Sequence, residues 1–155
     1  MSGPQIGDAI PAVKLLDADG AAIDLAAMTG APLIVYFYPK ADTPGCTTEA
    51  QDFTRLAPEF AHLNAQVLAV SRDAPTKLCK FRDKYGLTVR LASDEDGAVC
   101  EAFGTWVEKQ NYGRTYMGIE RSTFLFGADG KLAKAWRKVR VKGHADAVLE
   151  AAKAL

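Results

Sequence analysis

The sequence predicts an α/β protein in which helices flank a mixed central sheet. Three observations lead to this: two short, fully apolar segments, amphipathic segments that alternate with them, and a hairpin followed by a closing helix near the C-terminus. A strand–helix–strand unit favours parallel pairing, whereas a hairpin pairs antiparallel. With 155 residues, of which 48% are hydrophobic, we expect a single domain over residues 1–155.

The first half of the chain carries a clear strand and helix pattern. Asp19-Gly20 between two apolar stretches is typical of a hairpin turn. Continuous apolar runs indicate strands that are buried on both faces. Between two such runs, apolar residues recur every three or four positions up to Leu63, which predicts one long helix. The elements expected here are a hairpin at 13–25, strands at 32–38 and 66–71, and a helix from Thr43 to Leu63.

The second half alternates in the same way and then ends differently. Pro75 begins a segment in which Leu78, Phe81 and Tyr85 share one helical face, and Gly86 follows its end. A long polar and aromatic stretch has no clear period, and such stretches are often functional. The expected elements are a helix at 75–85, a strand at 89–91, a helix at 97–103, an irregular stretch at 104–120, a hairpin of 122–126 and 132–139, and a helix at 144–154.

Composition and charge exclude several classes of function. Nineteen basic and nineteen acidic residues cancel, so no nucleic-acid footprint is expected. No apolar run has the ~18 residues of a membrane span, and the first residues do not form a secretory signal. Three cysteines are too few for a secreted disulfide framework, so a reducing cytoplasm is expected.

The scattered histidines and cysteines also limit the chemistry. Their spacing matches no zinc site, so no metal and no cofactor are expected. We expect His62 and His144 at the surface. A cysteine hydrolase would need a histidine base beside its nucleophilic cysteine, and nothing in the sequence places His62 or His144 near Cys46.

One cysteine lies where a helix begins. Thr43 followed by Pro44 is a typical helix start, with Thr at the N-cap and Pro at the first helical position. Cys46 then falls in the first turn, where free N–H groups and the helix dipole favour an anion. A thiol there loses its proton more readily than a free thiol, and Gly45 allows a small ligand to approach the backbone. The alternative is a buried cysteine that packs as a small hydrophobic residue.

These residues resemble those of a known family. Pro39, Thr43 and Cys46 meet the Pro-x-x-x-Thr-x-x-Cys pattern of peroxiredoxins, and residues 37–47 resemble the Q-type branch, also called bacterioferritin comigratory protein. The resemblance extends over nearly the whole chain, including residues 91–96, 103–106 and 113–125. It implies a thioredoxin-like fold and thiol-dependent reduction of hydrogen peroxide and organic hydroperoxides.

The resemblance also assigns roles to residues. Cys46 becomes the nucleophile, converted to a sulfenic acid, and Thr43 and Arg121 assist it. Pro39, Gly45 and Trp106 are expected to bind the peroxide, with Tyr112 and Tyr116 also on the pocket rim. Without the family, a surface ion pair with Glu120 would be the expected role of Arg121.

The chain departs from the family at the second thiol. Many Q-type members carry a second cysteine five residues after the first, and here that position is Gln51. Cys100 leans toward an apolar helix face and is expected to be inert. Cys79 points away from the apolar face of its helix, and some Q-type members place the resolving thiol on this helix, so we predict that Cys79 resolves the Cys46 sulfenic acid. The resemblance also implies thioredoxin as reductant and a monomeric enzyme. A one-cysteine peroxidase, or a redox sensor resolved by an external thiol, is the alternative.

Overall fold

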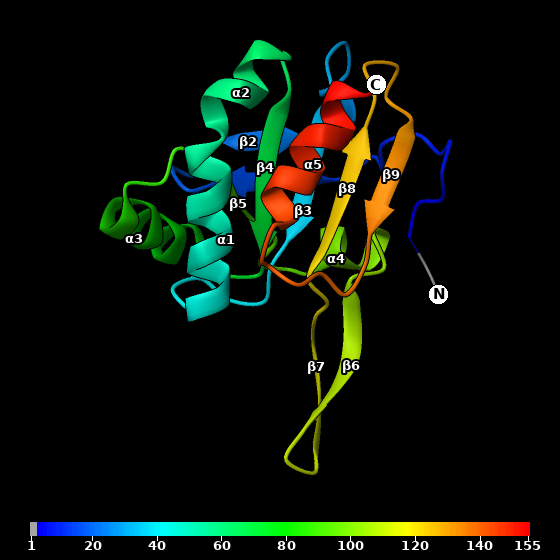
Figure 1. The fold of residues 1–155 in the computed structure, drawn as a ribbon. Coiled ribbons are helices and arrows are strands. Elements are labelled where there is room, and N and C mark those ends of the chain that lie inside the picture. The colour runs from blue at the N-terminus through cyan, green and yellow to red at the C-terminus, as the bar shows by residue number, and fades with distance from the viewer. Residues whose placement is uncertain (1–2) are drawn as a thin grey trace.

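The structure, a computed structural model, describes residues 3–155 and is built around a seven-stranded sheet (Figure 1). The strands β3, β4 and β5 run parallel, and β1, β2, β8 and β9 pair antiparallel with their neighbours. This confirms the expected mixed sheet and the parallel pairing of the first two buried strands. The spatial order is β2 (Ala22–Asp24), β1 (Lys14–Asp17), β5 (Arg90–Ser93), β4 (Gln66–Ser71), β3 (Leu33–Phe37), β8 (Ser122–Phe126) and β9 (Leu132–Trp136).

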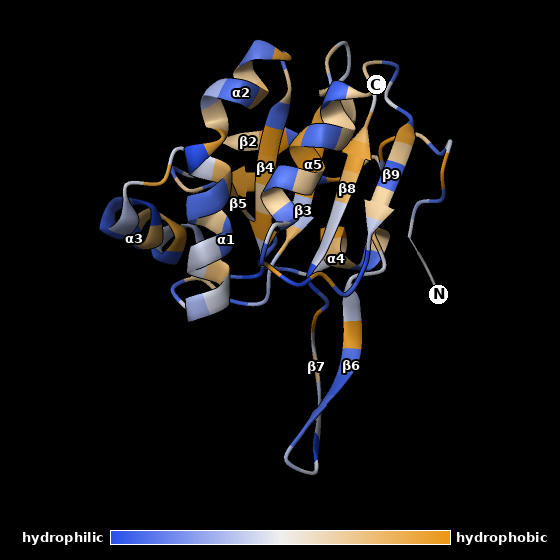
Figure 2. Cartoon of the chain, in the orientation of Figure 1, coloured by the Kyte–Doolittle hydropathy of each residue, from blue (hydrophilic) through white to orange (hydrophobic). Residues whose placement is uncertain are grey.

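Helices flank the sheet. In Figure 1, α1, α2 and α5 lie in front of it, α4 lies behind it, and α3 lies at the side. Figure 2 shows central strands that are almost wholly hydrophobic and helices that carry both polar and apolar residues. The helices are α1 (Pro44–Arg55), α2 (Ala57–His62), α3 (Pro75–Tyr85), α4 (Ala98–Ala102) and α5 (His144–Lys153), and the short 3-10 helix η1 (Leu25–Ala27) follows β2.

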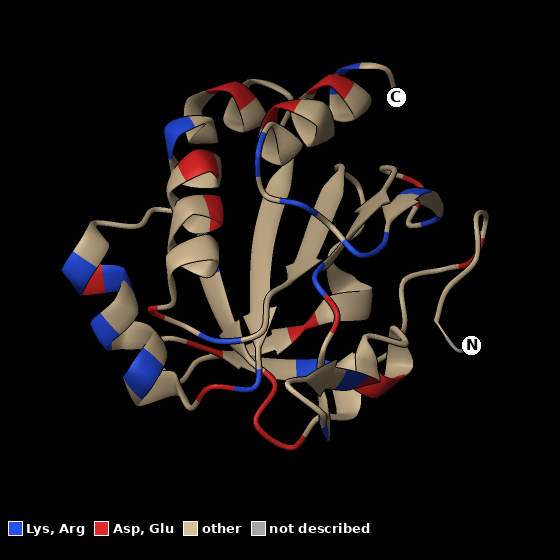
Figure 3. Cartoon of the chain, turned by 60° about the horizontal axis from the view of Figure 1, so that its bottom comes forward, with Lys and Arg blue, Asp and Glu red and all other residues tan. Residues whose placement is uncertain are grey.

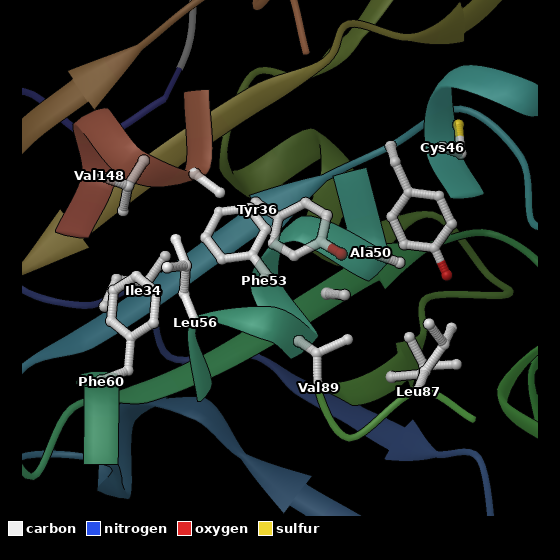
Figure 4. Packing of buried hydrophobic residues seen from close by; sticks show 14 of the residues in the cluster. Ile34, Tyr36, Cys46, Ala50, Phe53, Leu56, Phe60, Leu87, Val89 and Val148 are labelled. Atoms are coloured by element: carbon white, nitrogen blue, oxygen red, sulfur yellow. The ribbon is translucent and has the colours of Figure 1, made fainter. Parts of the chain in front are cut away.

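The strand β3 divides the core into two clusters. Ile34 and Tyr36 face the cluster under α1, α2 and α5, whereas Val35 and Phe37 face the cluster on the opposite side. All of β3 is buried because both faces are covered, which explains its continuous apolar run. Burying each such side chain contributes about 1.5–3 kcal/mol. Figure 4 shows the first cluster, with Cys46 at its edge.

The long helix expected after the first buried strand is in fact two helices. The chain leaves helical geometry at Leu56, and α2 resumes one residue later. Pro58 explains the break, because its ring has no N–H and collides with the carbonyl of Thr54, four residues earlier. Phe53 of α1 and Phe60 of α2 still pack in the same cluster, so the apolar period continued through the break.

The expectation of an irregular stretch at 104–120 is wrong. The chain there forms a two-stranded hairpin, β6 (Trp106–Asn111) and β7 (Arg114–Ile119), which projects away from the sheet (Figure 1). Tyr112 and Gly113 make the turn with φ of 51° and 77°. Two consecutive positive φ values match the type I′ turn that joins two-residue hairpins. Most of the hairpin is not buried, so its sequence lacks the apolar alternation of a core strand.

His144 is buried, which corrects its expected surface position, whereas His62 is exposed as expected. The His144 ring lies edge-on to Phe53 and Trp136, and its Nε2 is 2.7 Å from Thr123 Oγ1. Burial, with a smaller contribution from the positive charge of Arg121, lowers the pKa of His144 to about 4. The ring is therefore neutral near pH 7.

This burial predicts a pH dependence of stability. Between pH 6.5 and about 4 the unfolded chain binds a proton at His144 that the folded chain does not. The free energy of unfolding should therefore fall as pH falls through this window. We expect His144→Gln, which keeps a polar partner for Thr123, to have a flatter pH profile in urea denaturation, with His62→Gln as the control. An unchanged slope in His144→Gln would contradict the assignment.

Charged residues of both signs share the face seen in Figure 3. Basic residues gather on α3, and acidic residues occupy neighbouring loops. Arg82 of α3 pairs with Asp19 in the β1–β2 turn, so part of this basic charge is neutralised by contacts between elements. Among residues 3–155, no helix has the length and apolar character needed to span a bilayer.

Candidate active site

Cys46 lies in the first turn of α1, as the sequence predicted. Thr43 is the N-cap with extended backbone angles, Pro44 is the first helical residue, and Cys46 is the third. The loop before it is tied down by α3, because the Asp42 carboxylate accepts hydrogen bonds from Lys84 Nζ at 2.9 Å and Tyr85 Oη at 2.6 Å. These contacts from α3 hold the loop that leads to the thiol.

Arg121 joins the thiol to a buried carboxylate. Its Nη2 donates to Cys46 Sγ at 3.3 Å, and its Nη1 donates to Glu49 Oε1 at 2.6 Å. Cys46 is 2% exposed and Glu49 only 1%. Glu120, the expected surface partner of Arg121, instead pairs with Arg137 at 2.7 Å. One guanidinium therefore serves two acidic groups with separate N–H donors.

The charges of this set are strongly coupled. Burial raises the pKa of Glu49 to about 7, although the nearby Arg121 charge acts in the opposite direction. Burial by itself would lower the pKa of Arg121, but Glu49 and Cys46 outweigh it, and the pKa rises above its ordinary value. Arg121 is therefore a permanent cation beside the sulfur.

Not all of the other residues expected around the thiol make a direct contact within the site. Thr43 Oγ1 donates to the Lys40 carbonyl at 2.8 Å, so its proton is not directed at the sulfur. Gly45 lies against Arg121, because a Cβ at Gly45 would be 3.4 Å from Arg121 Nη2. Pro39 is exposed at the beginning of the loop that leads to α1. Of the expected site residues, the structure brings Cys46, Gly45 and Arg121 into contact.

Trp106 and the two tyrosines expected at the pocket rim lie on or next to the hairpin of β6 and β7. Trp106 is partly buried against the cluster that does not contain Cys46, and the Arg72 guanidinium lies 4.3 Å from the centre of its ring. Tyr112, at the hairpin tip, is 97% exposed, and Tyr116 is about half exposed. These aromatic residues belong to the hairpin and its base, a location that their resemblance to family motifs could not reveal.

The remaining cysteines differ from each other. Cys79 on α3 is half-buried, and Arg82 Nη2 donates to its sulfur at 3.3 Å. Cys100 is fully buried, and burial together with the Asp94 carboxylate raises its pKa well above the ordinary value. Cys100 is thus held as a thiol, as expected of an inert residue. All three cysteines are free, so Cys46 and Cys79 are not bonded to each other.

Two polar residues near the sulfur were missed by the sequence analysis. Glu49 follows Cys46 by three residues on the same helix face, a spacing that could have indicated it. Lys109 comes from the hairpin, and its stem crosses Gly118, where a Cβ would be 3.2 Å from Lys109 Cδ. Burial and the Arg121 charge lower the pKa of Lys109, whereas Cys46 acts to raise it. Only the fold places Lys109 within reach of these charges.

These contacts define what the site can do chemically. A thiolate at a helix start, next to a fixed cation, is a nucleophile that can attack an electrophilic oxygen. The same guanidinium can stabilise negative charge that develops on a leaving oxygen. Among residues 3–155 no group of three or more His, Cys, Asp or Glu side chains is arranged to hold a metal.

Several known proteins are similar to this one in sequence over most of the chain. The model of the AhpC/TSA family matches residues 6–135. Peroxiredoxin Bcp of Xanthomonas campestris pv. campestris is 51% identical over 135 residues, 87% of this chain and 84% of the relative. Peroxiredoxin Bcp of Bacillus subtilis is 44% identical over 149 residues, 96% of this chain and 95% of the relative.

Solved structures agree with this relationship. A structure of the Xanthomonas campestris bacterioferritin comigratory protein, described for its alkyl peroxide reduction activity, has a TM-score of 0.89 and 47% identity, covering 95% of this chain and 98% of that one. A PrxQ mutant from Xylella fastidiosa has a TM-score of 0.93 and 41% identity, covering 99% and 98%. The fold is therefore thioredoxin-like, as expected. The chain belongs to the AhpC/TSA family, in its Q-type or Bcp peroxiredoxin branch of thiol-dependent peroxidases.

Proposed function

We propose that this peroxidase reduces hydrogen peroxide and organic hydroperoxides through a sulfenic acid on Cys46. The thiolate attacks one peroxide oxygen, an S–O bond forms as the O–O bond breaks, and the other oxygen leaves as water or alcohol after taking up a proton. The observation that carries the proposal is the Arg121 guanidinium, which donates to Cys46 Sγ at 3.3 Å and is held in place by Glu49.

Thr43 and Gly45 complete the site in this proposal. The Thr43 hydroxyl uses its proton on the Lys40 carbonyl, so its oxygen is free to accept a hydrogen bond from the peroxide O–H. Gly45 carries no side chain that would crowd Arg121. Pro39 is exposed at the start of the same loop, and we keep it as a proposed contact for the peroxide.

The surface beside the first turn of α1 supports substrates larger than hydrogen peroxide. A hollow of ≈ 510 Å³ lies there, open to solvent, and its α1 side is formed by Pro44 and Gly45 together with Thr48, Asp52 and Arg55. Val141 and Gly143, from the segment before α5, form the facing side. We infer that the organic group of a hydroperoxide occupies this hollow while its terminal oxygens reach Cys46.

We propose further that Cys79 resolves the sulfenic acid as an intramolecular disulfide. Arg82 Nη2 donates to the Cys79 sulfur at 3.3 Å, the same donor atom and distance that Arg121 presents to Cys46, while the Cys79 thiol itself donates to the Asp83 carboxylate at 3.8 Å. Arg82 is itself held by both carboxylate oxygens of Asp19, at 3.1 Å each. A disulfide needs Cα atoms within about 7 Å, so the start of α1, or α3, is expected to unwind locally during the reaction.

Mass spectrometry after one equivalent of hydrogen peroxide tests this route. We expect a loss of about two daltons, as for a disulfide, in peptides containing Cys46 and Cys79. Cys79→Ser should instead accumulate sulfenic or sulfinic Cys46, while Cys100→Ala should form the disulfide normally. Sulfenic or sulfinic Cys46 in the unaltered protein, with Cys79 still open to alkylation, would establish the one-cysteine alternative.

The reductant is a thiol, and we propose thioredoxin in a reducing cytoplasm. Peroxide consumption at catalytic amounts of enzyme, coupled to thioredoxin oxidation, would support this. Stoichiometric oxidation without recycling would instead support a redox sensor. We also infer that a monomer suffices, because Cys46, Glu49 and Arg121 all come from one chain; activity that disappears with a dimer on dilution would refute this.

A further inference from the structure

Glu49 is a buried acid whose second oxygen has no partner. Its Oε1 accepts the hydrogen bond from Arg121, but Oε2 has no hydrogen-bond partner among residues 3–155. The hydroxyl of Tyr36, on β3, is likewise buried and unpaired. Glu49 is the charged group that acts most strongly on Tyr36. A buried carboxyl oxygen without a hydrogen-bond partner is costly, and more so when it is charged, so the charge state of Glu49 needs an explanation.

The charges around Glu49 do not balance if it is ionised. Among residues 3–155, Arg121 is the one cation that contacts both Glu49 and the Cys46 sulfur, so a carboxylate and a thiolate together leave a net negative charge in a buried site. Asp52, on the same helix, adds further negative charge. Two acids that share one cation cannot both ionise easily, and one of them keeps its proton.

Groups on the other elements do not supply the missing charge. Burial raises the pKa of Tyr36 well above its ordinary value, so the β3 hydroxyl stays neutral. His144 on α5 is neutral near pH 7 because its pKa is lowered to about 4. Lys109 on β6 is the other nearby cation, and its pKa is lowered by burial and by Arg121, while Cys46 and Glu120 act to raise it. Lys109 thus acts on the sulfur and Arg121 rather than on Glu49.

We propose that Glu49 carries a proton on Oε2 while Cys46 is a thiolate, and that it releases this proton when Cys46 is oxidised. The inference rests on the proposed role of Cys46. A proton on Oε2 leaves that oxygen neutral, and an unpaired neutral group in the core costs less than an unpaired charge. When the sulfur gives its electron pair to the peroxide oxygen, it loses its negative charge, and Arg121 is left with Glu49 alone. Glu49 then ionises and takes over the charge that the sulfur lost.

The proton balance of the reaction follows from this exchange. Conversion of a thiolate and a hydroperoxide to a sulfenic acid and an alcohol consumes one proton, which the leaving oxygen takes from water. Glu49 releases one proton to the solvent in the same step, so there is no net uptake of protons. The pKa of about 7 that burial produces at Glu49 supports such a change near physiological pH. Glu49 acts through Arg121 and is a positioning residue rather than a catalytic one.

Proton uptake during oxidation tests the proposal. Cys79→Ser protein, in which the sulfenic acid persists, is oxidised with one equivalent of hydrogen peroxide in weak buffer near pH 7 with an indicator dye. Thiolate absorbance beforehand shows that the sulfur is ionised. We expect almost no net proton uptake with Glu49 present, and one proton per sulfenic acid after Glu49→Gln, whose amide oxygen still accepts from Arg121. Glu101→Gln, at an exposed position on α4, is the matched control.

Infrared difference spectra provide a readout that does not depend on folding of the Glu49 variant. Oxidation of the otherwise unaltered Cys79→Ser protein should remove a protonated-carboxyl band. Uptake of one proton with Glu49 present, or no loss of the carboxyl band, would overturn the inference. Absence of sulfenic acid at Cys46 by mass spectrometry would instead overturn the proposed function, so the two failures are distinct.

Discussion

Serine in place of Cys46 is expected to abolish peroxide reduction, with a loss on the order of 10³-fold or more, the scale seen when a catalytic nucleophile is removed. A hydroxyl at this position is not ionised near neutral pH, so neither the helix start nor Arg121 can make it a comparable nucleophile. The fold should be retained, because serine is close to cysteine in size at a site on the edge of the core. Stopped-flow consumption of hydrogen peroxide and of an organic hydroperoxide measures the effect.

Cys100→Ala serves as the control for this result. Cys100 is fully buried on α4 with a raised pKa, so its removal should leave the peroxide rate unchanged. A Cys46→Ser protein that retains a substantial fraction of the rate would refute Cys46 as the nucleophile. Loss of activity in both variants, together with a lowered melting temperature, would indicate damage to the fold instead.

Lysine in place of Arg121 is expected to lower the peroxide rate by about 10²-fold, the scale for removing one donor that stabilises developing charge. Arg121 serves Cys46 with Nη2 and Glu49 with Nη1 at the same time, and the single ammonium of lysine cannot reproduce this planar fork. Lysine keeps the positive charge and can still donate a hydrogen bond to Glu49. The melting temperature should therefore change little.

Thiolate absorbance and melting temperature together distinguish loss of the two hydrogen bonds of Arg121 from loss of the fold. Thiolate absorbance near neutral pH should fall in Arg121→Lys, because the sulfur loses its nearest hydrogen-bond donor. Arg114→Lys, an exposed substitution on the hairpin, should leave both the absorbance and the rate unchanged. A normal rate in Arg121→Lys would show that charge alone suffices, and an unfolded variant would show that Arg121 acts mainly in stability.

Features that are set by residues close together in the sequence were predicted correctly. The cap at Thr43 and Pro44 and the place of Cys46 in the first turn depend on neighbouring residues, and the structure has them as expected. The continuous apolar run of β3 indicated a strand covered on both faces, which it is. Backbone angles and hydrogen bonds within one turn are set by nearby residues, so a single sequence can indicate them.

Features that depend on distant contacts were missed or misplaced. The polar hairpin 106–119 buries few side chains, so it left no apolar alternation to detect, although Gly113 was a usable turn signal. The helix break at Leu56 was hidden because the apolar period continues across it. His144 looked like a surface residue because its partner, Thr123, lies twenty-one residues away in the sequence.

The sequence by itself determined the α/β class, the helix start that presents Cys46, and the resemblance that led to Arg121. Only the tertiary structure decided that Glu49 shares Arg121 with the thiol, that Arg82 donates to Cys79, and that Trp106 packs on the opposite cluster. The physical reason is that a charge or ring is assigned its role by its partner, and these partners come from other elements. Arg121 and Glu49 lie seventy-two residues apart in the chain and 2.6 Å apart in the fold.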